Sequence, residues 1–179
     1  MASLLKLFFA AAFGALLAAC QTVPIPDTGT AYLVRHAEKV TSDHQMIVDD
    51  PMDPPLLPVG EVRAEALADR LMDADISAIW STDTTRTRST AAPLAARLGL
   101  TVQIYDPSDL DAFALALKAS PDANVLVVGH SNTTPYLAAA LGADPGAPIV
   151  EKGENDRLYV IDLATGAGEI QRYGAASVY

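Results

Sequence analysis

Leu33-Val34-Arg35-His36-Ala37-Glu38-Lys39 is the segment of this 179-residue chain that says most about its fold. The apolar run 31–34 has the composition of a buried strand, and a guanidinium and an imidazole follow it directly. Open α/β sheets place their binding and catalytic groups at such carboxyl ends of strands. The segment therefore predicts an α/β sheet with Arg35 and His36 at its functional edge.

Strand-like and helix-like patterns alternate after residue 30, as they do in a single α/β domain. Apolar runs predict the strands, apolar residues at helical spacing predict the helices, and the proline-rich segment 41–58 is expected to be a loop. We expect a three-layer α/β/α sandwich around a mostly parallel, doubly wound sheet with strand 125–128 near its centre. The expected strands are 31–34, 78–80, 102–105, 125–128, 158–162 and 169–173, and the expected helices are 61–72, 87–98, 110–119 and 134–141.

The amino-terminal residues have the pattern of a targeting signal rather than of a folded element. Lys6 precedes the apolar run 7–19, which is too short to span a bilayer comfortably. This run ends in Leu17-Ala18-Ala19-Cys20, which resembles a bacterial lipobox, and the resemblance implies cleavage before Cys20 and lipid attachment to it. The alternative is an ordinary secretory signal with a chance cysteine near its cleavage site.

These observations divide the chain into a lipoprotein signal peptide (1–19), a tether after the lipidated Cys20 (20–30) and a folded domain (31–179). Several acyl chains would anchor the protein stably to a membrane, whereas one chain alone binds only marginally. Thr22, in place of an acidic residue after Gln21, favours the outer membrane by resemblance to lipoproteins of known sorting. We therefore expect a lipid-anchored protein of the bacterial cell envelope that faces the periplasm.

Composition limits the chemistry and the partners. Cys20 is the only cysteine, so the domain 31–179 has no disulfide and no thiol chemistry. A formal net charge of −10 argues against nonspecific nucleic-acid binding, which needs a surplus of Lys and Arg. A site for an anionic substrate must therefore concentrate positive charge locally, and Arg35 and Arg86 are the obvious means.

Three polar segments carry the candidate chemistry: Arg35-His36, Arg86 within 82–87, and His130 within 127–133. Arg holds two phosphate oxygens with its planar fork, and neutral imidazole is a competent nucleophile near pH 7. Because the carboxyl ends of parallel strands converge on one crevice, we expect two Arg and two of the three His to meet there. The alternative for each residue alone is structural: surface ion pairs for the arginines and a core histidine for His130.

Together the three segments resemble the histidine phosphatase superfamily, also called the phosphoglycerate mutase-like family. The resemblance covers nearly all of 31–162. It implies that His36 is the phospho-accepting nucleophile and that Arg35 and Arg86, four residues before Thr90-Ala91, bind phosphate. His130, in Gly129-His130-Ser131, matches the second active-site histidine, which contacts the transferring phosphoryl group. It implies no metal and no cofactor.

The general acid that protonates the leaving oxygen is less clearly indicated. One family branch places an Asp directly after the second histidine, where this chain has Ser131. In the other branch the acid lies between the second arginine and the second histidine, where the candidates are Asp106, Asp109 and Asp111. Asp106 and Asp109 rank first, although Asp109 is also placed to cap a helix. Asn132 is a further candidate for substrate binding.

The resemblance thus implies an enzyme, a metal-independent histidine phosphatase that hydrolyses small phosphomonoesters. Phosphoramidates such as phosphohistidine, which need no general acid, are the alternative substrates. Mutase activity is disfavoured because mutases carry a larger insertion between the second arginine and the second histidine. A non-catalytic envelope protein that binds phosphate esters is the remaining alternative.

Overall fold

The computed structural model describes residues 28–44 and 46–178 of the chain. The predicted signal peptide, the lipidated cysteine and most of the tether lie outside these residues. In the described part of the chain, no helix has both the length and the apolar character needed to cross a bilayer. The strands are β1 (Thr30–Arg35), β2 (Ala78–Ser81), β3 (Val102–Ile104), β4 (Val125–Gly129), β5 (Arg157–Asp162) and β6 (Gly168–Arg172); the helices are α1 (Pro58–Leu71), α2 (Thr85–Leu98), α3 (Leu110–Lys118) and α4 (Thr133–Leu141), with a 3₁₀ turn η1 (Ser42–His44).

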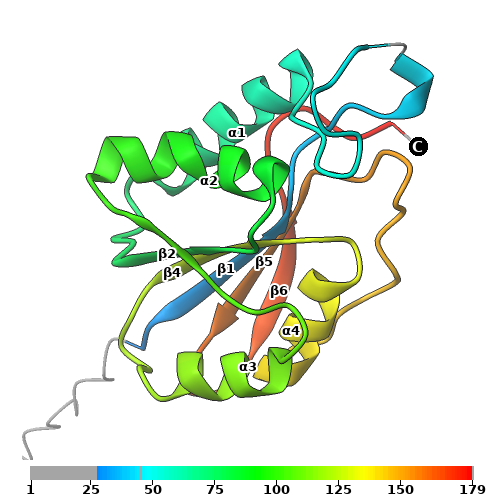
Figure 1. Cartoon of the computed structure of the whole chain (residues 1–179). Helices are drawn as coiled ribbons and strands as arrows, with labels where there is room; N and C mark the ends of the chain where they lie inside the picture. Colours follow the sequence, from blue (N-terminus) through cyan, green and yellow to red (C-terminus); the bar gives the residue numbers. More distant parts are fainter. Residues whose placement is uncertain (1–27, 45, 179) are drawn as a thin grey trace, which may run out of the picture.

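The six strands form one sheet in the order β3-β2-β4-β1-β5-β6. The first four run parallel to one another, while β5 and β6 pair antiparallel at one side. Helices α1 and α2 cover one face of the sheet, and α3 and α4 cover the other (Figure 1). The structure therefore confirms the predicted α/β/α sandwich with a mostly parallel sheet. It also places β4, whose five residues are all buried, in the interior of the sheet.

Successive residues of the inner strands point to opposite faces, and each face has its own apolar core. Leu33 and Val127 belong to the core beneath α3 and α4. Val34 and Val128, one residue later on the same strands, belong to the core beneath α1 and α2. Both faces of β1 and β4 are therefore buried, which explains why these strands are continuous apolar runs. Arg35 and His130 lie where these runs end, at the carboxyl edge of the sheet.

Two helices begin two or more residues earlier than the sequence predicts. α1 starts at Pro58, because proline at the first helical position is preorganised and has no amide hydrogen to satisfy. α2 starts at Thr85, whose backbone amide donates to the carboxylate of Asp53, a residue distant in sequence. Arg86 consequently lies in the first turn of a helix, where its backbone is fixed.

Candidate active site

The carboxyl ends of β1 and β4 bring the two candidate histidines together. Arg35 is in register with Gly129 across the parallel pair, and the amide of His36 donates to the Gly129 carbonyl at 2.9 Å. The ring centroids of His36 and His130 lie 5.6 Å apart in an edge-to-face arrangement. The strand register alone thus places the two imidazoles at one point on the sheet edge.

The His36 ring is held in one orientation and one protonation state. Its Nδ1 lies 2.7 Å from the carbonyl oxygen of Ala37, which can only accept, so Nδ1 carries the hydrogen and Nε2 keeps its lone pair. Burial, reinforced by the positive charges of Arg35, His130 and Arg86 and opposed by the Ala37 carbonyl, lowers the pKa of His36 to about 3. At neutral pH the ring therefore presents an unprotonated Nε2.

Arg35 is fixed by two backbone carbonyls from the turn before β5. Its Nη1 donates to Val150 O at 3.3 Å and to Glu154 O at 3.1 Å. Its Nε is buried and has no hydrogen-bond partner in the described residues. A buried guanidinium nitrogen without a partner is a strong donor in need of an acceptor. Arg35 is therefore prepared to bind an anion.

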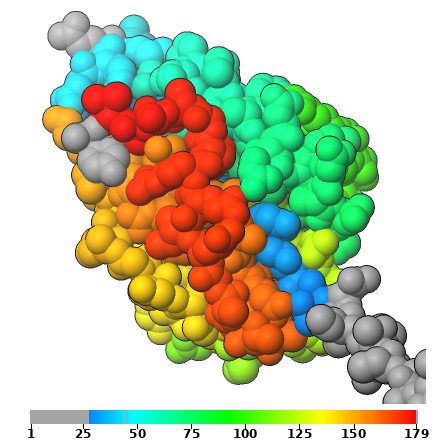
Figure 2. Space-filling view, turned by 180° about the vertical axis from the view of Figure 1, so that it is seen from behind, coloured from blue at the N-terminus to red at the C-terminus, as the bar shows by residue number. Residues whose placement is uncertain are grey.

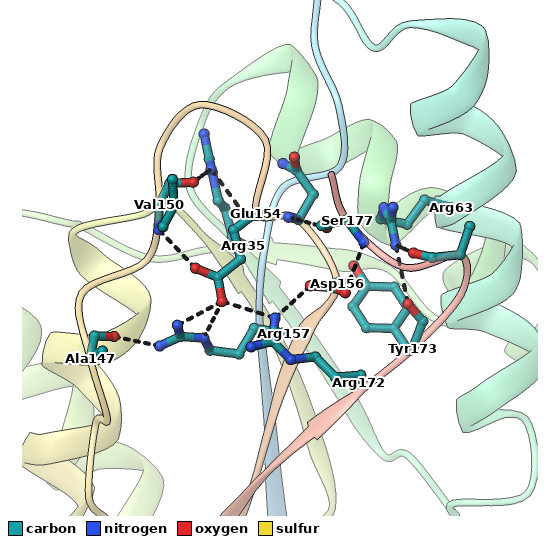
Figure 3. Close-up of polar contacts among 12 residues, drawn as sticks. Arg35, Arg63, Ala147, Val150, Glu154, Asp156, Arg157, Arg172, Tyr173 and Ser177 are labelled. Atoms are coloured by element: carbon teal, nitrogen blue, oxygen red, sulfur yellow. Dashed lines mark hydrogen bonds and ion pairs between the residues drawn. The ribbon is translucent and has the colours of Figure 1, made fainter. Parts of the chain in front are cut away.

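The turn that holds Arg35 is itself held by the carboxylate of Glu154, which is only 1% exposed (Figure 3). Oε2 accepts from the Val150 amide at 2.8 Å, and Oε1 accepts from Arg157 at 2.6 and 2.9 Å and from Arg172 at 2.9 Å. Burial raises the pKa of Glu154, but these hydrogen bonds and charges outweigh it and leave the pKa below its ordinary value. The carboxylate is thus ionised and fully engaged at neutral pH.

Arg86 reaches the same site from the first turn of α2. Its Nη1 forms an ion pair with Asp53 at 3.2 Å, and its Nε, like that of Arg35, is buried without a partner in the described residues. Asp53 also accepts hydrogen bonds from the amide and hydroxyl of Thr85, at 2.9 and 2.7 Å. One carboxylate from the loop before α1 therefore caps α2 and orients Arg86.

His130 is held by two threonine hydroxyl groups. Its Nε2 lies 2.9 Å from Oγ1 of Thr82, and its backbone amide donates to Oγ1 of Thr133 at 2.8 Å. Burial, followed by the charges of Arg86 and Arg35, lowers the pKa of His130 to about 4. The preceding Gly129 is required here, because an added Cβ would lie 2.7 Å from Thr133 Oγ1 and 2.8 Å from Tyr105 Oη.

A cavity of about 710 Å³ opens onto Arg35 and His36. The residues around Arg86 and His130 approach His36 from the β2 and β4 side, whereas the cavity extends from His36 toward the β5 side and the start of α1. The C-terminal segment and the loop before α1 lie next to each other at this end of the molecule (Figure 2). The cavity is lined by Arg35, His36, Glu38, Lys39, Thr41, Asp43, His44, Leu57, Val59, Glu151, Lys152, Gly153, Asn155 and Val178.

The structure does not bring Asp106, Asp109 or Asn132 to this cavity. Asp106 accepts from the amide and hydroxyl of Ser108, which lowers its pKa. Asp109 caps α3 by accepting from the Ala112 amide, as its position before that helix predicted. Asn132 is an exposed N-cap residue of α4.

Three carboxylates line the cavity instead, those of Glu38, Asp43 and Glu151. Glu38 is engaged by Arg63, with Oε1 2.7 Å from Nη2. Among the described residues there is no cluster of three or more His, Cys, Asp or Glu that could hold a metal ion. Sequence reasoning missed Asp53, Glu154 and Asn155, whose amide donates to the His36 carbonyl at 2.9 Å. Their sequence neighbourhood does not distinguish them from surface polar residues.

Comparison with known proteins gives one family. The sequence profile of the histidine phosphatase superfamily (branch 1) matches residues 31–107, from β1 past Arg86 and β3. Among proteins with curated descriptions, none matches this chain in sequence.

Solved structures share the fold over most of the chain. The protein histidine phosphatase SixA in complex with tungstate is 19% identical, with a TM-score of 0.59 over 82% of this chain and 96% of that one. A candidate phosphohistidine phosphatase SixA from Agrobacterium tumefaciens is 22% identical, with a TM-score of 0.60 over 83% and 98%. A mycobacterial glucosyl-3-phosphoglycerate phosphatase with inorganic phosphate is 18% identical, with a TM-score of 0.53 over 83% and 98%. The chain is therefore similar in sequence to the histidine phosphatase superfamily over residues 31–107, and it shares the fold of these solved structures over most of its length.

Proposed function

We propose that this protein is a phosphatase that hydrolyses phosphomonoesters or phosphoramidates through a phosphohistidine formed on His36. The observation that carries the proposal is the state of the His36 ring. Its Nδ1 hydrogen is bound to the Ala37 carbonyl and its low pKa keeps Nε2 unprotonated, next to two guanidinium groups whose Nε atoms lack acceptors. A nucleophile and an anion site adjoin one another.

In the first step, Nε2 of His36 attacks phosphorus and the bond between phosphorus and the leaving oxygen or nitrogen breaks. Arg35 and Arg86 bind the non-bridging oxygens and offset the negative charge that develops on them, and His130 contacts the same phosphoryl group. In the second step, water attacks phospho-His36 and releases inorganic phosphate, which restores the neutral ring. Each step needs only the chain's own residues, the substrate and water.

Protonation of the leaving group limits the range of substrates. An alkoxide needs a proton as it leaves, whereas the nitrogen of a phosphoramidate or a phenolate oxygen leaves more readily. Glu151 lines the cavity beside Arg35 and His36 and is the carboxylate we assign as donor for poor leaving groups. Asp106 and Asp109 lie elsewhere on the surface. The Asp106 carboxylate accepts from the Ser108 hydroxyl group, and the Asp109 carboxylate accepts from the Ala112 amide.

The test is hydrolysis of p-nitrophenyl phosphate by the full-length chain in the presence of chelator, beside the His36→Ala variant. We expect metal-independent turnover in the parent chain and none in the variant, with both proteins giving the same circular dichroism spectrum. A brief incubation with labelled substrate, quenched in alkali, should trap acid-labile, alkali-stable phosphate on the parent chain only. Turnover that persists in His36→Ala would refute the mechanism.

We also propose that this chemistry takes place in the bacterial cell envelope. The support is the sequence of residues 1–30, with its short apolar run and Cys20 after small residues. Growth with radiolabelled palmitate should label the parent chain and leave Cys20→Ser unlabelled, and fractionation of membranes should place the parent chain in the outer membrane. Equal recovery of both proteins in the soluble fraction would contradict the proposal.

A further inference from the structure

One charged side chain of the cavity wall, that of Lys39, has no role in the site described so far. Lys39 follows His36 closely in the sequence, is half-buried, and lines the same cavity as Arg35 and His36. Its ammonium group has no hydrogen bond or ion pair with any residue that the structure describes. A partly buried charge without a partner has lost hydration and gained nothing in exchange. The position of this lysine therefore needs an explanation.

The backbone at Lys39 is fixed by contact with the loop before α1. Lys39 forms an antiparallel bridge with Leu56, and the amide of the next residue, Val40, donates to the carbonyl of Pro55 at 2.9 Å. Val40 is buried, and successive side chains of an extended segment point to opposite sides. Burial of Val40 on one side therefore directs Lys39 to the other side, where the cavity lies.

Lys39 adds a third positive charge to the two guanidinium groups of the proposed phosphate site. Burial lowers the pKa of Lys39, the charges of Arg86 and Arg35 lower it further, and the charge of Glu151 opposes them. The ammonium group therefore lies within electrostatic range of both arginines. Three neighbouring cations repel one another, and an anion bound among them would offset this repulsion. The chain concentrates these cations in one place although its formal net charge is −10.

The number of cations matches the number of oxygens on a phosphate group. A phosphate monoester spreads its negative charge over three non-bridging oxygens. The Nε atoms of Arg35 and Arg86, which lack partners in the described part of the chain, can each bind one of these oxygens. An ammonium group is a compact charge with three rotatable donors on a flexible stem, so it can reach a remaining oxygen without a fixed planar geometry.

We infer that Lys39 is a substrate-binding residue, the third cation that holds the non-bridging oxygens of the phosphate group beside His36. This inference rests on the proposed function, because it assumes that the phosphate binds there. The negative charge of the substrate is present before His36 attacks, so Lys39 stabilises the bound substrate and the transition state about equally. Its contribution should therefore be found in KM and in the affinity for inorganic phosphate, and hardly in kcat.

The experiment compares Lys39→Met, which keeps the length of the side chain and removes its charge, with Lys39→Arg, which keeps the charge. The inhibition constant of inorganic phosphate against p-nitrophenyl phosphate and its dissociation constant by calorimetry are measured on the full-length chain. One hydrogen bond to a charged group corresponds to about tenfold in affinity. We therefore expect both constants and KM to rise about tenfold in Lys39→Met, with little change in kcat, and Lys39→Arg to recover most of the affinity.

Two other lysines provide the controls. Lys152 lines the same cavity but is exposed, so Lys152→Met should weaken phosphate binding much less than Lys39→Met. Lys118 donates to the Ala140 carbonyl at 2.9 Å on α3, and Lys118→Met controls for the change in net charge. Equal effects of Lys39→Met and Lys152→Met would overturn the inference. A fall in kcat with unchanged phosphate affinity would also overturn it, because Lys39 would then act on the leaving group.

Thermal unfolding separates a binding role from a structural one. Without phosphate, Lys39→Met should unfold at no lower a temperature than the parent chain, because the variant lacks one of three mutually repelling charges. Inorganic phosphate should raise Tm more in the parent chain than in the variant. A variant that is destabilised equally with and without phosphate would show that Lys39 supports the fold, which would overturn the inference.

The outcomes also separate this inference from the function on which it rests. Turnover of p-nitrophenyl phosphate, with phosphate affinity unchanged in Lys39→Met, supports the phosphatase and overturns the role of Lys39. Phosphate binding that weakens in Lys39→Met, without turnover in the parent chain, supports the role of Lys39 and refutes catalysis. If the parent chain neither turns over the ester nor binds phosphate, both proposals are wrong.

Discussion

Glu154 supports Arg35 through a single turn of the backbone: its carboxylate binds the amide of Val150, and its own carbonyl accepts from Arg35 Nη1 at 3.1 Å. The second carbonyl on Arg35 is that of Val150. The carboxylate therefore closes the turn whose two carbonyls hold the guanidinium. A residue that does not line the cavity thus determines the position of a residue that does.

Glu154→Gln should destabilise the protein and weaken phosphate binding. Losing the buried charge leaves Arg157 without its ion-pair partner and removes one of the two carboxylates that bind Arg172, and we expect the free energy of unfolding to fall by about 3 kcal/mol. Because Arg35 loses its fixed position, KM for p-nitrophenyl phosphate should rise severalfold, with a smaller fall in kcat. Urea unfolding and steady-state kinetics at low temperature measure the two effects.

Glu65→Gln is the matched control for Glu154→Gln. Glu65 also binds an arginine, Arg97, but both side chains lie on the surface, where an ion pair contributes about 0–1 kcal/mol. Equal stability and equal KM in the two variants would show that the buried carboxylate has no special role.

The activity should be insensitive to pH in the range where an ordinary histidine titrates. For a histidine with a pKa near 6.5, the fraction in the reactive neutral form falls about thirtyfold from pH 8 to pH 5. With the pKa of His36 lowered to about 3, the nucleophile stays neutral throughout this range. We expect kcat/KM, corrected for ionisation of the substrate, to change less than threefold between pH 5 and pH 8.

The same lowered pKa values affect stability. Between pH 6.5 and about pH 4 the unfolded chain binds protons on His36 and His130 that the folded chain does not, so stability falls as the pH falls. His36→Gln removes one of these groups and should make unfolding less steeply dependent on pH in this window. Unfolding in urea at pH 4.5 and pH 7 tests this, and an unchanged pH dependence would show that His36 is protonated in the folded protein.

Thr82→Val should lower kcat without unfolding the protein. Valine has nearly the shape of threonine but removes the hydroxyl group that contacts His130 Nε2 at 2.9 Å. Losing one hydrogen bond to an active-site ring should cost about tenfold in kcat. Thr82→Ser, which keeps the hydroxyl group, should recover most of the activity. A loss as large in the serine variant as in the valine variant would assign the effect to packing.

Asp53→Ala should lower the free energy of unfolding by about 1 kcal/mol, because α2 loses the carboxylate that accepts from the Thr85 amide. Arg86 loses its ion pair in the same variant and should bind phosphate less well. Asp83→Ala is the control, since Asp83 lies just before α2 and pairs with the exposed Arg88 on that helix. Urea unfolding should show this loss of stability in Asp53→Ala and a clearly smaller one in Asp83→Ala.

The fold could be predicted because its strands are local patterns. Runs such as 125–128 are apolar on every residue, and only a strand buried on both faces requires that composition. The positions of Arg35 and His130 follow from the parallel register of β1 and β4, which places every carboxyl end at the same edge. These features depend on a few neighbouring residues each.

The supporting residues could not be predicted because their partners are distant in the sequence. Asp53 caps a helix that begins after β2, and the side chain of Asn155 binds the backbone of His36, which lies in the other half of the chain. A capping aspartate was expected at Asp109, where the helix follows directly, and the structure has it there. Local caps are visible in a sequence, whereas caps supplied by a loop elsewhere are not.

The antiparallel placement of β5 beside β1 has a consequence for when the site is completed during synthesis of the chain. Both arginines and both histidines have been made once residue 130 leaves the ribosome, yet the carbonyls that hold Arg35 and the amide that holds His36 come from residues 150–155. These contacts form late because they join residues that are far apart in the sequence. A nascent chain that carries all four groups therefore still lacks the contacts that hold Arg35 and His36, and these contacts form only after residues 150–155 have packed against the end of β1.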